Sequence, residues 1–474
     1  MPRLLLLIGL VFAVITAPAT ADPTPVSPDQ KAIRAAGFDP ADIGFALVNL
    51  DDGRAVAENA ADSLFIPASV AKLATVFPAE TLLGADFRFE TRLWRAGETL
   101  YLQGGGDPVL TNIELRDLAK SLKAAPLAGT WKRFVFDAGA VAARPEVDDG
   151  QPDEAVYNAG FGALNVDFNR VQVNWSHDGE GKLRFQPRAI ADGLNVPADW
   201  IGVLPAVSPS PPGANFLYAG DAGGEKWLYA LGLPETLPEE GAILLPVKSA
   251  ALNTAEVFRR IAGDLGVKLP APQAGTVPPD ATLIAMVESP PLSEIMTGLL
   301  KYSNNMTAEL IGMAASHRLT GQVLDPPASA AALSQWLENR LSYVDWHGFR
   351  LVNHSGLSTK NRASPRQIAA VLTAIARDPA LAAMPSKIMG DDPGAEAVAK
   401  TGTMDFACGL AGLFTAKSGR RFAFAIFAID RDRRTKLDAN FDGRILAPTP
   451  GAAGWLGRAR ALEAALLKDW RQRF

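Results

Sequence analysis

The sequence predicts a multidomain α/β protein in which one mixed domain is interrupted by a long β-rich segment. The chain has 474 residues, which at roughly 100–200 residues per domain corresponds to about two to four domains. Helix and strand patterns mix near both ends, in residues 29–83 and from residue 290 onward. Between them, residues 85–283 are dominated by short alternating strand patterns bounded by turn residues. We therefore expect an insertion within a domain that both ends of the chain build.

The first mixed segment predicts a helix at PDQKAIRAAG and a strand at IGFALVNL, followed by a hairpin turn at residues 51–53. The stretch FIPASVAKLATVFPAE, residues 65–80, is typical of the start of an apolar helix. It contains Ser69 and, three residues later, Lys72. Such a lysine either extends its charged end out of a buried helix into solvent or acts as the base that activates the serine.

The inserted segment predicts strand pairs at RFETRLWRAGETLYLQ and at NRVQVNWSHDGEGKLRFQP, and its GGGD stretch lacks the spacing of a phosphate-binding loop. After residue 290 the chain predicts several helices and then strands at CGLAGLFTA and RRFAFAIFAID. The last segment, GWLGRARALEAALLKDWRQRF, places Trp455, Leu462 and Trp470 on one helix face. We expect this helix to cover a sheet, with peripheral membrane contact as the alternative.

Composition and charge exclude several classes of function. The net charge of −5 argues against nucleic-acid binding, which requires a basic face. The 4 histidines have no metal-ligand spacing and no H-E-x-x-H occurs, so we expect neither a metal nor another cofactor. The single cysteine, Cys408, excludes an intramolecular disulfide, and we expect it to be buried rather than nucleophilic.

The N-terminus predicts export. Arg3 precedes an apolar run at residues 4–15, and the small-x-small pattern at residues 19–21 precedes Asp22. The run is shorter than the roughly 20 residues that a membrane-spanning helix requires. We expect a signal peptide at residues 1–21 and a periplasmic protein, with an uncleaved membrane anchor as the alternative.

Three short motifs follow one another along the chain. The first is S-x-x-K at Ser69 and Lys72, the second is S-x-N at residues 303–305, and the third is K-T-G at residues 400–402. Each motif alone is common by chance, whereas the ordered set is typical of β-lactamases and penicillin-binding proteins. No G-x-S-x-G is present, and the adjacent pair His354 and Ser355 is poorly placed for a Ser-His triad.

The first motif has the chemistry of an activated nucleophile. Serine is a weak nucleophile until a base takes its proton. Positions i and i+3 share one face of a helix, so the Ser69 hydroxyl and the Lys72 amine can meet. Lysine is a base only when it is neutral, and apolar neighbours together with a second cation such as Lys400 would lower its pKa. We therefore predict that Lys72 activates Ser69.

The chain resembles the D-alanyl-D-alanine carboxypeptidases/endopeptidases of the class C low-molecular-mass penicillin-binding proteins. The resemblance rests on the three motifs, on their spacing, and on the segments LYLQGGGDPVLT, ALNVDFNRVQV, SPPLSEI, SNNMTAEL, HSGLS and KTGTM in this order. It implies a β-lactamase/transpeptidase-like domain, an antiparallel sheet with helices, interrupted by β-rich inserted domains. The transpeptidase-like domain is expected at residues 22–84 and 284–474. Domain II, which is inserted in it, is expected at 85–165 and 245–283. Domain III, which is inserted in domain II, is expected at 166–244.

The resemblance also implies roles in the reaction. Ser303 is expected to relay a proton to the leaving D-Ala nitrogen, and Asn305 is expected to hydrogen-bond the substrate amide. The backbone N–H groups of Ser69 and Thr403 are expected to form the oxyanion hole.

The strand that carries K-T-G is expected to bind the substrate along its edge. Lys400 and Thr401 would receive the terminal carboxylate, Gly402 would permit close approach, and Met404 would line the side-chain pocket.

An acidic and an aromatic residue of the insertion usually complete this pocket, and PDEAVYNAG offers Asp153 and Tyr157. Thr359 stands where the family often has an arginine, and the cations that could replace it are Lys360 and Arg362.

We therefore expect a periplasmic serine DD-peptidase that acts on peptidoglycan stem peptides through an acyl-enzyme on Ser69 and is acylated by β-lactams. The sequence leaves open a serine β-lactamase or esterase with the same catalytic residues, which would need fast deacylation. It also leaves open a non-catalytic peptidoglycan-binding protein. No nucleic-acid partner is expected, and membrane contact is expected to be peripheral at most.

Overall fold

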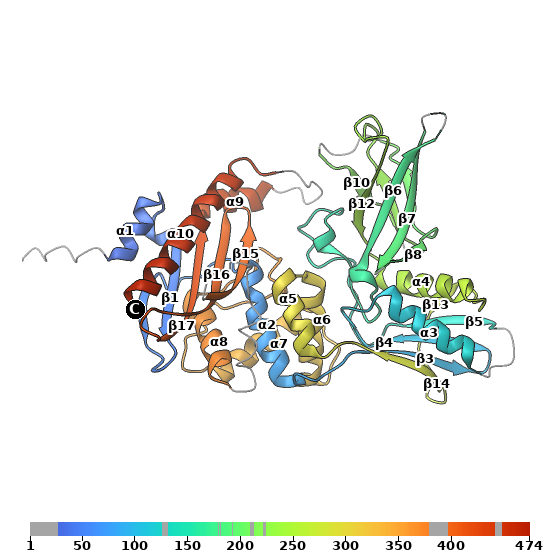
Figure 1. The fold of residues 1–474 in the computed structure, drawn as a ribbon, viewed down its shortest axis with the longest axis horizontal. Helices are drawn as coiled ribbons and strands as arrows, with labels where there is room; N and C mark the ends of the chain where they lie inside the picture. The colour runs from blue at the N-terminus through green and yellow to red at the C-terminus, as the bar shows by residue number, and fades with distance from the viewer. Residues whose placement is uncertain are drawn as a thin grey trace, which may run out of the picture.

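The computed structural model describes most of the chain beyond its N-terminal segment (Figure 1). The described residues are 27–125, 131–178, 180, 182–191, 193–208, 213–220, 224–378, 397–440 and 448–474. The predicted signal peptide, residues 1–21, lies outside them. Elements from both ends of the chain form one half of the molecule in Figure 1, and the elements between α2 (Lys72–Leu83) and α5 (Leu292–Tyr302) form the other half.

A five-stranded antiparallel sheet with the order β15-β16-β17-β1-β2 joins the two ends of the chain. Its strands are β1 (Ile43–Asn49), β2 (Ala55–Asn59), β15 (Ala397–Met404), β16 (Ala407–Thr415) and β17 (Arg421–Ile429). The apolar sequence of β17 is buried along nearly its whole length because both faces of the sheet are covered. Phe424 packs into the core on one face and Phe427 into the core on the other.

Helices cover both faces of this sheet. One face packs against α1 (Pro28–Ala35) and α10 (Ala452–Arg473), which buries Trp455 and Trp470. The C-terminal helix therefore covers the sheet, as we expected. The other face packs against α2, and the remaining helices of this half are α5, α6 (Asn305–Thr320), α7 (Pro326–Arg340), α8 (Pro365–Arg377) and α9 (Arg431–Asn440).

The S-x-N motif separates two of these helices. Helix α5 ends at Tyr302, and Ser303 follows in the left-handed conformation with φ of 57°. The side chain of Asn304 then caps α6 by accepting the N–H of Thr307. Ser303 therefore lies between the two helices, and Asn305 is the first residue of α6.

The intervening chain forms three further sheets. The first has the order β13-β5-β4-β3-β14, the second β12-β6-β7-β8, and the third β10-β11-β9. Their strands are β3 (Glu90–Ala96), β4 (Thr99–Gly104), β5 (Arg133–Asp137), β6 (Arg170–His177), β7 (Leu183–Ala191), β8 (Leu194–Pro197), β9 (Gly202–Pro205), β10 (Phe216–Tyr218), β11 (Lys226–Tyr229), β12 (Glu240–Pro246), β13 (Pro272–Ala274) and β14 (Thr282–Glu288). The predicted pairs β3–β4 and β6–β7 are both antiparallel hairpins.

Two helices pack on the first of these sheets, and one of them was not expected in a β-rich segment. Helix α4 (Ala250–Asp264) matches the predicted helical pattern, whereas α3 (Asn112–Ala124) does not. Its sequence signal is a capping box, in which Thr111 accepts the N–H of Ile113 and Glu114 accepts the N–H of Thr111.

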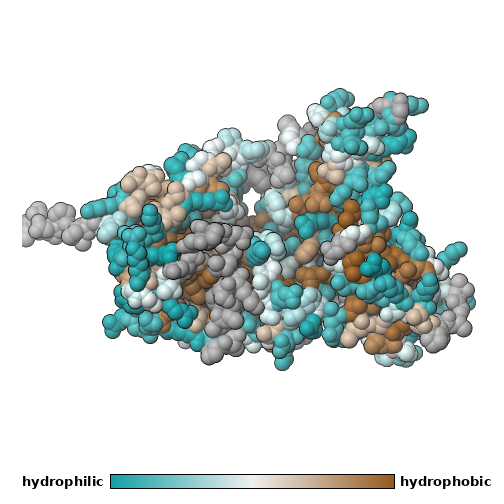
Figure 2. Space-filling view, viewed as in Figure 1, coloured by the Kyte–Doolittle hydropathy of each residue, from teal (hydrophilic) through white to brown (hydrophobic). Residues whose placement is uncertain are grey.

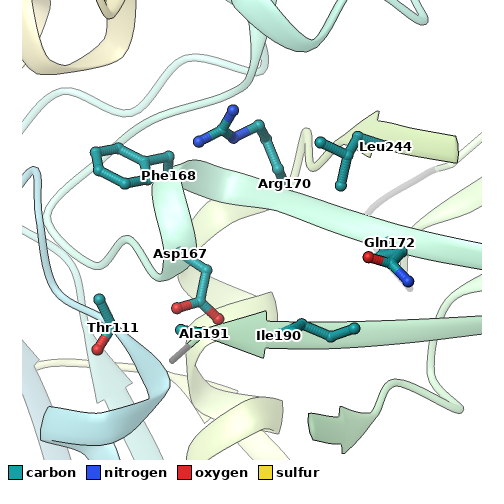
Figure 3. A pocket seen from close by; sticks show the side chains of 8 residues that line it. All are labelled: Thr111, Asp167, Phe168, Arg170, Gln172, Ile190, Ala191 and Leu244. Atoms are coloured by element: carbon teal, nitrogen blue, oxygen red, sulfur yellow. The ribbon is translucent and has the colours of Figure 1, made fainter. Parts of the chain in front are cut away.

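The inserted segment contacts helix α6 through a left-handed turn. Asp167, Phe168 and Asn169 have φ values of 51°, 57° and 50°, which is unusual for residues other than glycine. Phe168 packs with Met306 in a small core cluster between the two halves. Figure 3 shows that Asp167 and Phe168 of this turn border a cavity of about 350 Å³ at the start of β6.

The predicted fold class, a mixed α/β fold interrupted by β-rich insertions, is confirmed by these sheets. The residue limits of the three domains stay a prediction.

In Figure 2 hydrophobic side chains gather on the half of the molecule that holds α3 and α4. No helix in the described ranges is long and apolar enough to span a membrane.

Candidate active site

Ser69 lies in a short 3-10 helix (Ala68–Ala71) that runs directly into α2. Strand β15 passes close to this turn at Gly402. A Cβ atom at Gly402 would lie 2.6 Å from the carbonyl oxygen of Pro67 and 3.1 Å from the amide nitrogen of Ser69. Glycine is therefore required at this position for the strand to approach the serine.

Lys72 is fully buried, and its amine lies among three oxygen atoms. Nζ is 3.0 Å from Ser69 Oγ, 2.8 Å from Asn305 Oδ1 and 2.7 Å from the carbonyl oxygen of Ser355. A neutral amine has two N–H groups and one lone pair. The two carbonyl oxygens accept the two N–H groups, so the lone pair is left for the hydroxyl proton of Ser69.

The surroundings of Lys72 favour this neutral form. Burial lowers the pKa of Lys72 well below its usual value, the nearby Lys400 ammonium lowers it further, and the Glu309 carboxylate opposes both effects. The side chain is 0% exposed, so Lys72 does not extend its charge into solvent. Of the two interpretations that the sequence left open, the structure favours the chemical one.

The other residues of the S-x-N motif face the same centre. Ser303 lines the active-site cleft, and its buried hydroxyl has no hydrogen-bond partner among the described residues. Asn305 donates from Nδ2 to the carbonyl oxygen of Tyr157 at 3.0 Å while its Oδ1 accepts from Lys72. One N–H of the Asn305 amide is left for a substrate.

Strand β15 is at the edge of its sheet and presents the K-T-G residues. Lys400 is buried, donates to the carbonyl oxygen of Thr401 at 2.8 Å, and has its pKa lowered to about 8 by burial. Thr401 is exposed, whereas Thr403 and Met404 line the cleft. Thr403 Oγ1 also accepts from Arg460 at 3.1 Å.

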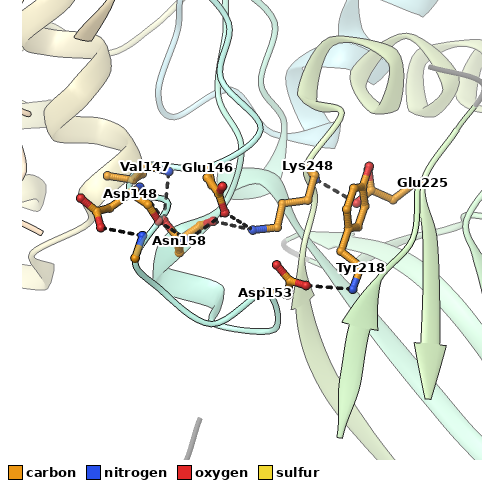
Figure 4. Close-up of polar contacts among 9 residues, drawn as sticks. Glu146, Val147, Asp148, Asp153, Asn158, Tyr218, Glu225 and Lys248 are labelled. Carbon is orange, nitrogen blue, oxygen red and sulfur yellow. Dashed lines mark hydrogen bonds and ion pairs between the residues drawn. The ribbon is translucent and has the colours of Figure 1, made fainter. Parts of the chain in front are cut away.

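The cleft has a volume of about 770 Å³ and lies between β15, the S-x-N junction and the segment 148–157 of the insertion. Tyr157 lines it as predicted, but Asp153 does not. The carboxylate of Asp153 instead accepts the N–H of Tyr218 at 3.2 Å, which directs it toward strand β10 (Figure 4). The acidic side chains of this segment that do line the cleft are Asp148 and Asp149.

Basic side chains line the cleft from the segment around HSGLST and from Arg434 of α9. Thr359, Lys360 and Arg362 line the cleft together with Arg350. Arg362 donates to the carbonyl oxygen of Thr359 at 2.6 Å. The cleft therefore offers both acidic and basic groups to a substrate.

Sequence reasoning missed Glu309, which lies one helical turn after Asn305. Its carboxylate is fully buried and accepts the N–H groups of His354 at 3.0 Å and Ser355 at 2.8 Å. These bonds hold the segment whose Ser355 carbonyl oxygen binds Lys72. Burial raises the pKa of Glu309, while the N–H donors oppose the change. The only sequence signal was an acidic residue within an apolar helix.

Two other candidates of the sequence have structural roles. His354 is fully buried, its Nε2 lies 2.7 Å from Ser329 Oγ, and burial lowers its pKa to about 3, so it is neutral. Cys408 is buried beside Glu463, and burial raises the pKa of its thiol. No group of three His, Cys, Asp or Glu side chains within the described ranges could hold a metal ion.

A serine and a buried lysine at the start of a central helix, with the S-x-N and K-T-G residues beside them, are the arrangement typical of penicillin-recognising serine enzymes. A sequence profile of the D-Ala-D-Ala carboxypeptidase 3 (S13) family matches residues 30–443, and the chain belongs to this family. The resemblance found from the motifs is thereby confirmed.

Individual relatives agree with this membership. Carboxypeptidase DacB of Mycolicibacterium smegmatis is 30% identical over 217 residues, 40% of this chain and 45% of that protein. The D-alanyl-D-alanine carboxypeptidase of Actinomadura sp. (strain R39) is 27% identical over 350 residues, 67% of this chain and 61% of that protein. The chain thus spans about half to three fifths of the length of these curated relatives.

Solved structures share the fold. Penicillin binding protein 4 (dacB) from Haemophilus influenzae superposes with a TM-score of 0.73 and 20% identity, covering 93% of this chain and 99% of that chain. The same protein complexed with a novel β-lactam gives a TM-score of 0.67, also with 20% identity, over 90% of this chain and 96% of that chain.

Proposed function

We propose that the protein is a periplasmic serine DD-peptidase that cleaves the D-Ala-D-Ala bond of peptidoglycan stem peptides and is acylated by β-lactams. The observation that carries the proposal is the buried amine of Lys72, which is held by Asn305 Oδ1 and the Ser355 carbonyl oxygen at 3.0 Å from Ser69 Oγ. Family membership and the β-lactam complex of the structural relative support it.

In the proposed reaction, Ser69 Oγ attacks the carbonyl carbon of the penultimate D-Ala while Lys72 Nζ takes the hydroxyl proton. The backbone N–H groups of Ser69 and Thr403 stabilise the oxyanion. Ser303 gives its hydroxyl proton to the departing D-Ala nitrogen and regains one from the Lys72 ammonium, which returns Lys72 to its neutral form. Water then hydrolyses the acyl-enzyme. A penicillin follows the same first step, but its leaving group stays attached.

The substrate would lie along β15, with its terminal carboxylate near Lys400 and Thr401. Its side chain would reach into the cleft, which Asp148, Asp149, Arg350 and Arg362 line. Such a mixture of charges suits a stem peptide with an amine and a carboxylate on one side chain, as in a diaminopimelate-type residue. Asp148 and Asp149 thus take the role that we expected of Asp153.

The test is covalent labelling with a fluorescent penicillin, followed by the release of the label over time. A DD-peptidase retains the label for many turnovers of its peptide substrate, whereas a β-lactamase or esterase releases it quickly. A protein that is never labelled and does not release D-Ala from a stem peptide is a binding protein, and the proposal is then wrong.

Two further measurements complete the proposal. Sequencing the N-terminus of the exported protein tests the cleavage after residue 21 and the periplasmic location. Digestion of purified sacculi, with identification of the released muropeptides, separates trimming of terminal D-Ala from cleavage of cross-links.

A further inference from the structure

The catalytic centre includes one backbone group from the inserted segment. Asn305 Nδ2 donates to the carbonyl oxygen of Tyr157, a residue 148 positions away in the sequence. A carbonyl oxygen only accepts hydrogen bonds, so this contact requires that the Asn305 amide turns its NH₂ toward Tyr157. The oxygen of the same amide then faces Lys72 and accepts its N–H at 2.8 Å.

If the amide rotated by half a turn, its NH₂ would face the N–H groups of Lys72. Two donors would then meet, and the Lys72 amine would lose one of the two acceptors that aim its lone pair at Ser69. The orientation of Asn305 therefore depends on the position of the Tyr157 carbonyl group.

The position of Tyr157 is fixed by its neighbour Asn158, whose side chain is fully buried. Asn158 Oδ1 accepts the N–H groups of Val147 at 3.0 Å and Asp148 at 2.9 Å. Its Nδ2 donates to the carbonyl oxygen of Asp148 at 3.0 Å. These three bonds close the segment 147–158 into a compact loop, as Figure 4 shows.

A buried lysine then ties this loop to the inserted sheets. Lys248 Nζ donates to the backbone oxygen of Asn158 at 3.2 Å and pairs with the Glu146 carboxylate at 3.4 Å. The Lys248 side chain is only 2% exposed. Its own backbone N–H donates to Glu225 at 2.9 Å, so both ends of the residue are held (Figure 4).

We infer that Lys248 and Asn158 are positioning residues of the reaction: they hold the Tyr157 carbonyl group where it orients Asn305, and Asn305 in turn aims Lys72 at Ser69. The inference rests on the proposed function. It means that the insertion contributes to acyl transfer itself, including acylation by small penicillins.

The test measures penicillin acylation in Lys248→Met and Asn158→Ala, two variants that each release the loop in a different way. We expect the maximal acylation rate to fall about tenfold, or ~1.4 kcal/mol, with the half-saturating penicillin concentration changed less than about twofold. The control is Trp94→Phe, which removes the bond from Trp94 Nε1 to Gln103 Oε1 at 2.9 Å between β3 and β4 of the inserted half, strands that hold none of the hydrogen-bond partners named above. It should destabilise the protein and leave the acylation rate within about twofold.

The decisive measurement repeats Lys248→Met in an Asn305→Ala background, with acylation followed by intact mass over hours. Since the effect passes through Asn305, the second substitution should add less than about a twofold loss there. Equal losses in both backgrounds, or a Lys248→Met variant that acylates at the wild-type rate, would overturn the inference. A wild-type protein that penicillin does not acylate would instead refute the proposed function.

Discussion

The amine of Lys72 lies 3.0 Å from the hydroxyl oxygen of Ser69, inside a helix start where the lysine has no exposed surface. Two oxygens from distant parts of the chain, Asn305 Oδ1 and the Ser355 carbonyl oxygen, complete its surroundings. We expect a lysine in this arrangement to act as a base.

Ser69→Ala should abolish penicillin acylation and leave the fold intact, because the substitution removes only the Oγ atom. Intact mass spectrometry after incubation with penicillin measures the adduct, and circular dichroism with a melting curve checks the fold. A covalent adduct at the wild-type rate would remove Ser69 as the nucleophile.

Lys72→Arg should lose nearly all acylation although the positive charge is kept. An arginine is not deprotonated in a protein, so it cannot take the Ser69 proton. The acylation rate with excess penicillin is the measurement. A variant that keeps more than about a tenth of the wild-type rate, a loss under ~1.4 kcal/mol, contradicts the assignment of Lys72 as base.

Penicillin recognition should weaken above about pH 8. Burial lowers the pKa of Lys400 to about 8, so its charge is present below this pH and is lost as the pH rises through it. The half-saturating concentration of penicillin should therefore rise on the alkaline side. A penicillin methyl ester lacks the carboxylate and serves as the control. An equal rise for the ester would show that Lys400 does not bind this group.

Asp148→Asn combined with Asp149→Asn should lower kcat/KM for a stem peptide with a free side-chain amine by at least about tenfold, or ~1.4 kcal/mol. Remote contacts of this kind orient the scissile bond. Penicillin acylation should stay within about threefold, because penicillin lacks the amine. Asp153→Asn is the matched control, since Asp153 faces Tyr218 and not the cleft, and it should leave peptide hydrolysis nearly unchanged.

Glu309→Gln should destabilise the protein by about 1–3 kcal/mol, since one of the N–H groups of His354 and Ser355 would face an NH₂ group instead of an oxygen. Acylation should also slow, because the Ser355 carbonyl oxygen shifts away from Lys72. Urea unfolding and acylation rates measure both effects. Glu338→Gln, an exposed change on helix α7, is the control and should alter neither. Wild-type stability in Glu309→Gln would rule out this structural role.

The sequence by itself determined the outline of the fold and predicted which side chains react. The alternating and apolar patterns predicted β3, β4, β6, β7, β16 and β17, because side-chain periodicity is a local property. The motif around Ser69 and Lys72 predicted their contact, because positions three apart share one face of a helix. The helix α3 was missed, since a strand-rich context outweighed its short capping signal.

Only the tertiary structure decided what surrounds the reactive pair. The contacts of Lys72 with Asn305 and Ser355 join residues 233 and 283 positions apart. The groups from Ser355 and Tyr157 are backbone carbonyls, which every residue has, so no sequence pattern marks them. The choice between Asp153 and the pair Asp148 and Asp149 was likewise made by the fold. One loop carries all three, but Asp153 accepts the N–H of Tyr218 from strand β10, whereas Asp148 and Asp149 line the cleft.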